Sequence, residues 1–261
     1  MNSERNTRIA ALALVLTLVF SFVLPASASA TYESPGFASA EDALMAYIEG
    51  LQQGDLQQMI GAFAIETYIE HFDLVAWIER VISHSFHSTS TVRLPNANPM
   101  VTALNIESRR ANILGIIQYQ LIAFHLEEQF ESGPLIFGPP IGPFPHDILG
   151  SAEDFVDMLR TNMETMALQS MQLVSFMEPA MLAEAYDNEK NQADLDRKRA
   201  IYGADELKSV AAFFTVDGKL YVLCADAIRY GERWYLESLA GNIGAHLRID
   251  VFQGGIMQIT Q

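Results

Sequence analysis

The sequence predicts an α+β domain, in which antiparallel strands near the C-terminus pack against helices from the first half of the chain. Asp217-Gly218 is a two-residue turn between two runs rich in β-branched and aromatic residues, a pattern typical of a β-hairpin. Gly231 offers a second turn, and Arg233-Trp234-Tyr235-Leu236 follows it as a third strand. Segment 40–63 instead carries apolar residues at helical spacing. These observations predict a meander of at least three strands and a set of N-terminal helices.

A turn at Asp217-Gly218 would fix the register of the hairpin. Counting outward from it, the expected pairs are Val216–Lys219, Phe214–Tyr221, Phe213–Val222, Ala212–Leu223 and Ala211–Cys224. Both faces of this ribbon are largely apolar, so neither resembles a plain solvent face. We expect one face to pack on a helix, and the other to be covered by a second element or to line a cavity.

Residues 1–30 have the three-part pattern of a secretory signal peptide. Arg5 and Arg8 precede an apolar run at 9–24, and the small residues at 26–30 follow Pro25. The alternative is an uncleaved membrane anchor, but the apolar run is short for a membrane span. We therefore predict cleavage near residue 30 and a single α+β domain over 31–261. The mature protein would be secreted or extracytoplasmic, meeting a membrane only transiently through its signal peptide.

Charge and cysteine content limit the classes of partner. The formal net charge is -16, and it becomes -17 without the leader, because Glu4, Arg5 and Arg8 are removed together. Such an acidic protein is repelled by nucleic acid and by anionic membrane surfaces, so no nucleic-acid partner is expected. Cys224 is the single cysteine, which excludes an intramolecular disulfide. Within an apolar strand, it is expected to be a small buried hydrophobe.

The N-terminal helices carry recognisable caps. Ser39 precedes two acidic residues and can cap a first helix, which Gly54 can end. Asp55 can then cap a second helix, and Asp73 a third.

The remaining segments alternate between loops and regular structure. Composition predicts a loop at 88–100 and a proline- and glycine-rich linker or lid-like loop at 133–150. The expected elements are a long helix from about 105 to 130, a helix at 151–167, a strand at 171–177, a polar helix at 183–202 ended by Gly203, and a short helix or strand after 239.

Two separated segments resemble a known superfamily. SAEDALMAYIEGLQQGDLQQMIGAF is similar to the opening helices of extracytoplasmic domains in the nuclear-transport-factor-2-like (cystatin-like cone) superfamily. VDGKLYVLCADAIRYGERWYLESL is similar to their closing strands. The resemblance implies a strongly curved antiparallel sheet, wrapped on the N-terminal helix around a cone-shaped pocket. Residues at about 64–167 exceed what compact members need, so they are interpreted as a helical elaboration.

Candidate chemistry is sparse. His84 and His87 are three residues apart, yet no further ligand with metal-site spacing accompanies them. The acidic residues at 187–196 are interspersed with basic ones and lack the glycine of a calcium loop, which favours a solvated helix face. Consequently, we assign no catalytic, cofactor-binding or metal-binding residue and expect no cofactor.

The sequence leaves the function open between different classes. We expect a secreted, non-catalytic binding domain for a small apolar ligand, an envelope component or a protein partner. The alternative is a small isomerase, cyclase or dehydratase, since enzymes of the suspected fold place an acid or base and a tyrosine in the pocket. Tyr47, Tyr221 and Asp226 are the residues that could serve this purpose. A structural surface protein with a filled cone is a third possibility.

Overall fold

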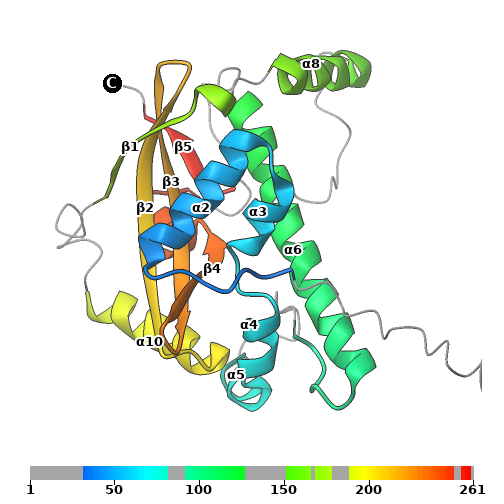
Figure 1. Cartoon of the computed structure of the whole chain (residues 1–261), viewed down its shortest axis with the longest axis vertical. Coiled ribbons are helices and arrows are strands. Elements are labelled where there is room, and N and C mark those ends of the chain that lie inside the picture. The colour runs from blue at the N-terminus through cyan, green and yellow to red at the C-terminus, as the bar shows by residue number, and fades with distance from the viewer. Residues whose placement is uncertain are drawn as a thin grey trace, which may run out of the picture. The chain divides into compact units, whose positions relative to one another are not determined.

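An antiparallel sheet with helices on both faces forms the body of the protein. The computed structural model describes residues 32–81, 92–126, 151–165, 168–177, 188–249 and 254–259 (Figure 1). The expected leader, the pair His84 and His87, and the loop at 133–150 lie outside these residues. Tyr32–Gln261 forms one structural unit.

Five strands make the sheet, in the order β1-β2-β3-β4, with β5 pairing to β3. Their bounds are Gln172–Phe176 (β1), Glu206–Val216 (β2), Lys219–Tyr230 (β3), Arg233–Leu239 (β4) and Ile256–Gln258 (β5). All strand pairs are antiparallel, and the register shifts between Leu173 and Ser175 and between Asp226 and Ala227. Such irregularities bend and twist a sheet.

The central hairpin has the predicted register throughout. Val216 pairs with Lys219, and every expected pair outward to Ala211–Cys224 is present. Asp217 has φ 49° and Gly218 has φ 77°, so both central residues occupy the left-handed region that a type I′ turn requires. The second turn is also confirmed, since Tyr230 pairs with Arg233 on either side of Gly231.

The first helices begin and end where their caps predict. Ser39 accepts a hydrogen bond from the Asp42 amide at the start of α2 (Ala40–Gln53), and Gly54 ends it in the left-handed conformation. Asp55 caps α3 (Leu56–Gly61) through two backbone amides, and Asp73 accepts from the Ala76 amide in the first turn of α5 (Leu74–Val81). A short helix, α4 (Glu66–His71), lies between α3 and α5 in the chain, and the sequence analysis did not predict it.

The later helices differ from expectation mainly at their starts. The long helix α6 (Pro99–Leu126) begins six residues before the predicted Asn105, because Asn98 accepts a hydrogen bond from the Val101 amide and Pro99 occupies the first helical position. The polar helix α10 (Glu189–Tyr202) begins at its Asn188 cap rather than at 183. The other later helices are α8 (Ala152–Thr165), the 3-10 turn η1 (Leu168–Ser170) and α11 (Gly241–His246).

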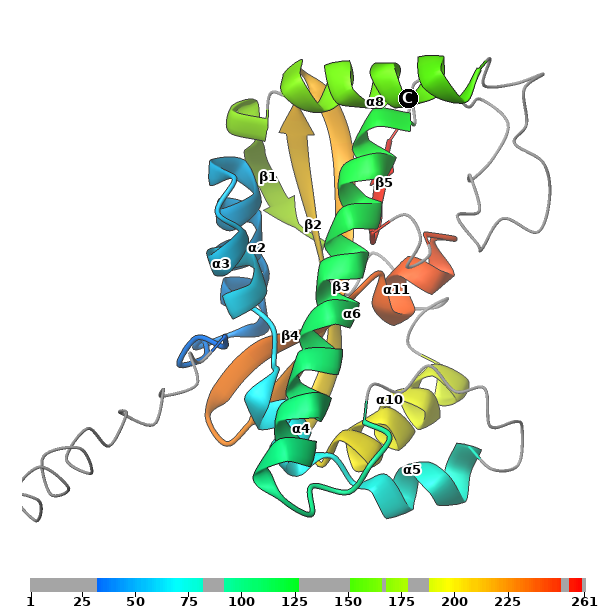
Figure 2. The same cartoon turned by 90° about the vertical axis from the view of Figure 1, so that its right-hand side faces the viewer.

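Helices cover both faces of the sheet, as the apolar hairpin requires. Figure 2 shows α2 and α3 on one side and α10 and α11 on the other. On the first side, α2 packs against β2, β3 and β4, and Leu44, Tyr47 and Leu51 join Phe214 and Leu223 in the main core. This arrangement confirms the predicted fold class: an N-terminal helix packed on an antiparallel sheet, with a helical elaboration in the middle of the chain.

The second face is covered by shorter elements. Ile243 of α11 and Ile249 pack on Ala211, Val222 and Cys224. Further along the same face, residues of α4 and α10 join the ends of β2, β3 and β4 in a separate apolar cluster. Within the described part of the chain, no helix combines the length and the apolar character needed to cross a membrane.

Candidate functional site

The main core fills the space between α2 and the sheet. Tyr47 and Phe63 are fully buried there and meet edge to face, with ring centroids 5.7 Å apart. Phe214 and Tyr221 stack across the hairpin, and Phe124 of α6 lies against both rings. In the described residues, the inner face of the expected cone is therefore occupied by side chains of the protein itself.

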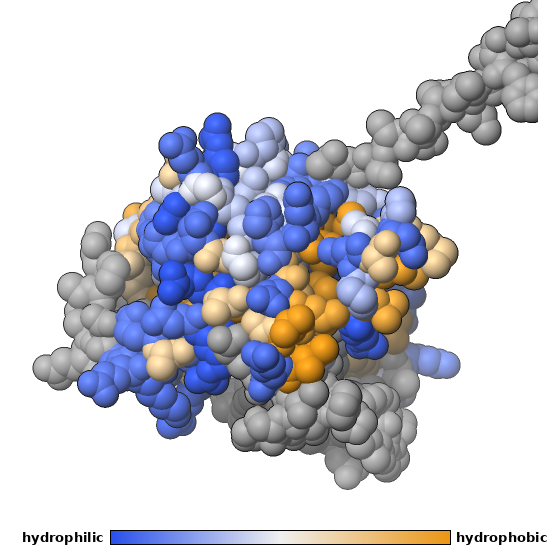
Figure 3. Space-filling model, turned by 90° about the horizontal axis from the view of Figure 1, so that it is seen from below, coloured by the Kyte–Doolittle hydropathy of each residue, from blue (hydrophilic) through white to orange (hydrophobic). Residues whose placement is uncertain are grey.

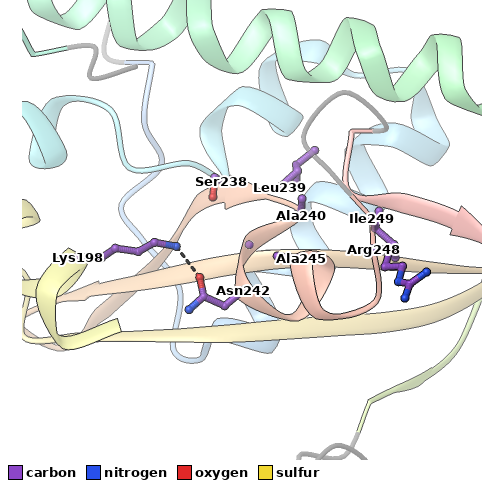
Figure 4. Close-up of a pocket in the computed structure, with 9 residues that line it drawn as sticks. Lys198, Ser238, Leu239, Ala240, Asn242, Ala245, Arg248 and Ile249 are labelled. Carbon is purple, nitrogen blue, oxygen red and sulfur yellow. Dashed lines mark hydrogen bonds between the residues drawn. The ribbon is translucent and has the colours of Figure 1, made fainter. Parts of the chain in front are cut away.

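A hollow of about 430 Å³ lies instead beside α11, on the other side of the sheet (Figure 4). Such a volume falls in the usual range of small-molecule sites. Its lining comes from α10, the end of β4, α11 and the turn after α11. The lining residues are Lys198, Ser238, Leu239, Ala240, Gly241, Asn242, Ala245, Arg248 and Ile249.

A buried carboxylate lies behind this hollow. Asp226 on β3 is fully buried, and its Oδ1 accepts hydrogen bonds from the Ser209 hydroxyl at 2.5 Å and from the Asn242 amide at 3.1 Å. Its Oδ2 accepts from Lys198 Nζ at 3.1 Å. Each carboxylate oxygen thus has a donor, as a buried charge requires.

The polar network continues along the hollow. Lys198 Nζ also donates to Asn242 Oδ1 at 2.6 Å, and Asn242 Nδ2 donates to Asn191 Oδ1 at 2.8 Å. Asn191, Leu195, Lys198 and Tyr202 are spaced three and four apart on α10, which places them on one helix face. The solvated face predicted for this helix is confirmed for Asp194 and Asp196, which pair with Arg197 and Arg199 at the surface. Lys198 departs from that prediction, because it faces the sheet.

The ion pair fixes the protonation of Lys198. Burial of the ammonium group lowers its pKa, but the Asp226 carboxylate and the more distant Glu237 together outweigh that effect, so the net pKa is raised. Lys198 is therefore a protonated hydrogen-bond donor at neutral pH and not a free base. Cys224, the next inward-facing residue on the same strand, is fully buried, and desolvation raises the pKa of its thiol to about 12, which suits the predicted structural role.

The backbone around the hollow is strained. Ala240 (φ 72°, ψ -68°) and Arg248 (φ 65°) are non-glycine residues with positive φ, and both line the hollow. Asp217, the other described residue of this kind, is explained by its hairpin turn. Gly241 allows the same segment to approach Asp226, since a Cβ at this position would lie 2.2 Å from Asp226 Oδ1. Strained backbone of this kind is concentrated at functional sites.

The structure does not bring together the three residues named for an enzyme. Tyr47 and Tyr221 lie in the main core on the α2 face. Asp226 points to the opposite face of β3, because residues five apart on a strand face opposite sides. The Tyr47 hydroxyl donates to Gln120 Oε1 at 2.6 Å, and burial raises its pKa. The tyrosines are thus core residues, and only Asp226 belongs to the hollow.

A second buried ion pair lies near the first. Arg109 of α6 donates from Nη1 to Glu237 Oε1 at 3.4 Å, from Nη2 to the Glu237 carbonyl oxygen, and from Nε to the Ala64 carbonyl at 3.2 Å. The guanidinium also lies 4.2 Å from the centroid of the Tyr68 ring. Arg109 and Glu237 are 4% and 7% exposed, so their charges compensate each other inside the protein.

Metal ligation finds no support in the described segments, where no cluster of three or more His, Cys, Asp or Glu side chains could hold an ion. The expectation for His84 and His87 stays a prediction, since both lie outside those segments.

The fold and site define an α+β domain with a helix-packed antiparallel sheet and a small lateral hollow. No family model matches the chain, and no curated protein matches it significantly. Among solved structures, the chain is similar to a cystatin-like protein from Ruminococcus gnavus, with 11% sequence identity and a TM-score of 0.44. The match covers 85% of this chain and 45% of that one, so the chain spans less than half of the matched structure.

Proposed function

We propose that this protein is an exported, non-catalytic domain that binds a small, largely apolar molecule in the hollow beside α11. The observation that carries the proposal is the composition of that hollow. Its lining includes the apolar residues Leu239, Ala240, Ala245 and Ile249, of which Ala245 is exposed, while the carboxylate of Asp226 behind it forms an ion pair with Lys198. Sites for small molecules commonly combine apolar walls with a few fixed polar groups.

The state of the charged groups favours binding over acid–base catalysis. A general base must be able to accept a proton from the substrate near neutral pH. Both oxygens of the fully buried Asp226 already accept hydrogen bonds from protein groups, and the raised pKa of Lys198 keeps its amine protonated, so neither is presented to a substrate as a free base. The polar network supports a role in shaping the hollow.

Export is part of the same proposal. The pattern at 1–30 supports removal of a signal peptide and a mature N-terminus near Thr31. Tyr32 is already held by the domain, because its amide donates to Glu66 Oε1 at 2.8 Å and its hydroxyl to Glu107 Oε1 at 2.8 Å. Tyr32, the first residue that the structure describes, therefore has hydrogen-bond partners within the domain.

The test is a thermal-shift screen of the mature chain with small lipophilic compounds. Since a ligand that binds only the folded state stabilises it, at least one compound should raise the melting temperature in a concentration-dependent way. Asn242→Leu should abolish that shift, while Val174→Ala on the exposed strand β1 should retain it. Turnover of any compound, lost on Asp226→Asn, would establish the isomerase, cyclase or dehydratase alternative instead.

A protein partner is the second candidate, and exposed apolar residues of α5 and α6 favour it. Figure 3 views the end of the domain that carries α5, where hydrophobic residues gather on part of the surface. Val75 is 66% exposed on α5, and Met100 and Leu104 are 68% and 55% exposed in the first turns of α6. Exposed apolar patches often mark protein interaction sites. A complex that is lost on Val75→Asp/Met100→Asp, with the hollow intact, would favour this candidate.

A further inference from the structure

The hollow beside α11 has two chemically different ends. Lys198 and Asn242 meet through a hydrogen bond at one end, and Ser238 lies beside them (Figure 4). Exposed Ala245 and the largely buried Leu239 and Ile249 supply apolar atoms along the rest of the lining, with Arg248 at its far end (Figure 4). A molecule that fills this space needs a polar head at the first end and an apolar body, which is the character of an amphiphile.

Charge compensation decides what kind of head fits. The Lys198 ammonium is paired with Asp226, whose side chain is fully buried. Glu237, the neighbour of Ser238 in the chain, is paired with the buried Arg109. Two closed ion pairs leave no unpaired charge at the Lys198 end of the hollow, and the charged Arg248 of the lining lies at the opposite end (Figure 4). At the Lys198 end, a charged head would thus be desolvated without a new counter-charge, at a cost that a neutral head avoids.

The hydrogen-bond donors at the polar end decide which neutral head group fits. A lysine ammonium has three donors, and two are used here by Asp226 and Asn242. The Ser238 hydroxyl can supply another donor. Both groups can donate toward the hollow, so the complementary head is one that accepts hydrogen bonds.

We infer that the hollow takes an uncharged amphiphile whose head is a hydrogen-bond acceptor, such as the carbonyl of an ester, held by Lys198 and Ser238. This inference rests on the proposed binding function and specifies its ligand class. The acyl or alkyl body lies along Leu239, Ala245 and Ile249. Asp226 acts as a positioning residue, since it holds Lys198 in place without contacting the ligand.

The test compares three probes with the same body length and different heads: methyl octanoate, octanoate and octylammonium. Calorimetric titration of the mature chain at pH 7 should give about tenfold tighter binding for methyl octanoate than for either charged probe. Ser238→Ala should weaken methyl octanoate binding about three- to tenfold, because one hydrogen bond is lost. The exposed Ser175→Ala on β1 is the matched control, and it should leave the affinity unchanged.

The possible results distinguish failure of the uncharged-amphiphile inference from failure of the proposed small-molecule binding. Tighter binding of octanoate, abolished by Arg248→Gly, would show an anionic head held by Arg248, so the inference would be wrong while small-molecule binding stood. A preference for octylammonium would overturn the inference in the same way. Absence of binding by all three probes, together with a negative lipophile screen, would defeat both.

Discussion

Replacing Lys198 with methionine tests the polar network in the most informative way. The change keeps a side chain of similar length but removes the cation that faces Asp226. The carboxylate is fully buried, whereas the Lys198 side chain is 30% exposed. Removing Lys198 should therefore destabilise the fold more than removing the charge of Asp226. An unpaired carboxylate at position 226 cannot be hydrated, whereas an unpaired Lys198 ammonium can turn to solvent.

The expected magnitudes follow from this asymmetry. Removing one partner of a buried ion pair typically costs about 3–5 kcal/mol. Asp226 would keep the Ser209 hydroxyl and the Asn242 amide as donors, so Lys198→Met should cost about 3 kcal/mol, at the low end. Asp226→Asn should cost only about 1–2 kcal/mol. In the double variant, the two losses should be non-additive by at least about 1 kcal/mol.

Urea unfolding of the mature chain measures these free energies, with Lys190→Met as the matched control. Lys190 is exposed on the same helix, and its replacement should change stability by less than about 0.5 kcal/mol. A cost for Lys198→Met below about 1 kcal/mol, or a larger cost for Asp226→Asn than for Lys198→Met, would contradict the burial and pairing of the carboxylate.

Three further predictions concern stability. The folded-state pKa of Lys198 is raised above its ordinary value of 10.5, so its contribution to the free energy of unfolding is complete below pH 10.5 and is lost as the pH rises through the folded-state pKa. The difference in unfolding free energy between the wild type and Lys198→Met should therefore shrink in alkaline solution. A difference that stays constant with pH would refute the pairing. Trp234 is 8% exposed within the main core, so Trp234→Ala should cost about 3–5 kcal/mol in urea melts, and a loss below about 1 kcal/mol would count against its packing. A Cβ at Gly218 meets no atom within 4 Å, so Gly218→Val should cost about 1–2 kcal/mol through its positive φ alone, and Gly218→Asn clearly less; equal losses would argue against the turn.

Local chemistry made the central hairpin and the first helices predictable. The Asp217-Gly218 turn alone determines eleven strand pairs, because side-chain alternation propagates a register along both strands. Ser39, Gly54 and Asp55 define helix ends through contacts within a few residues. Such signals are complete in the sequence.

The sequence contains a start signal for α6, but the polar composition around it pointed to a loop. Asn98-Pro99 has the cap and first-position residues of a helix, yet the surrounding polar composition predicted a loop up to residue 100. The short helix α4 was harder to predict, because part of its start is capped from outside. Glu33, more than thirty residues earlier, accepts hydrogen bonds from the Ile65 and Thr67 amides at 2.6 and 3.0 Å.

The hollow could be predicted only in fragments. Asp226 was singled out in the sequence, but as a companion of Tyr47 and Tyr221; the parity of strand positions already places Tyr221 and Asp226 on opposite faces. The pairing of Asp226 with Lys198 joins positions 28 residues apart on different elements, and no local pattern encodes it. The spacing of Lys198 from Leu195 and Tyr202 on one helix face was the available hint.

The location of the bound ligand tests the central claim most directly. Amide chemical shifts of the isotope-labelled mature chain, followed during titration with methyl octanoate, would locate it residue by residue. Binding beside α11 predicts progressive shifts at Ser238, Asn242, Ala245 and Ile249, with Tyr47 and Phe214 unaffected. Shifts confined to the core between α2 and the sheet, or no saturable shifts at all, would contradict the proposed site.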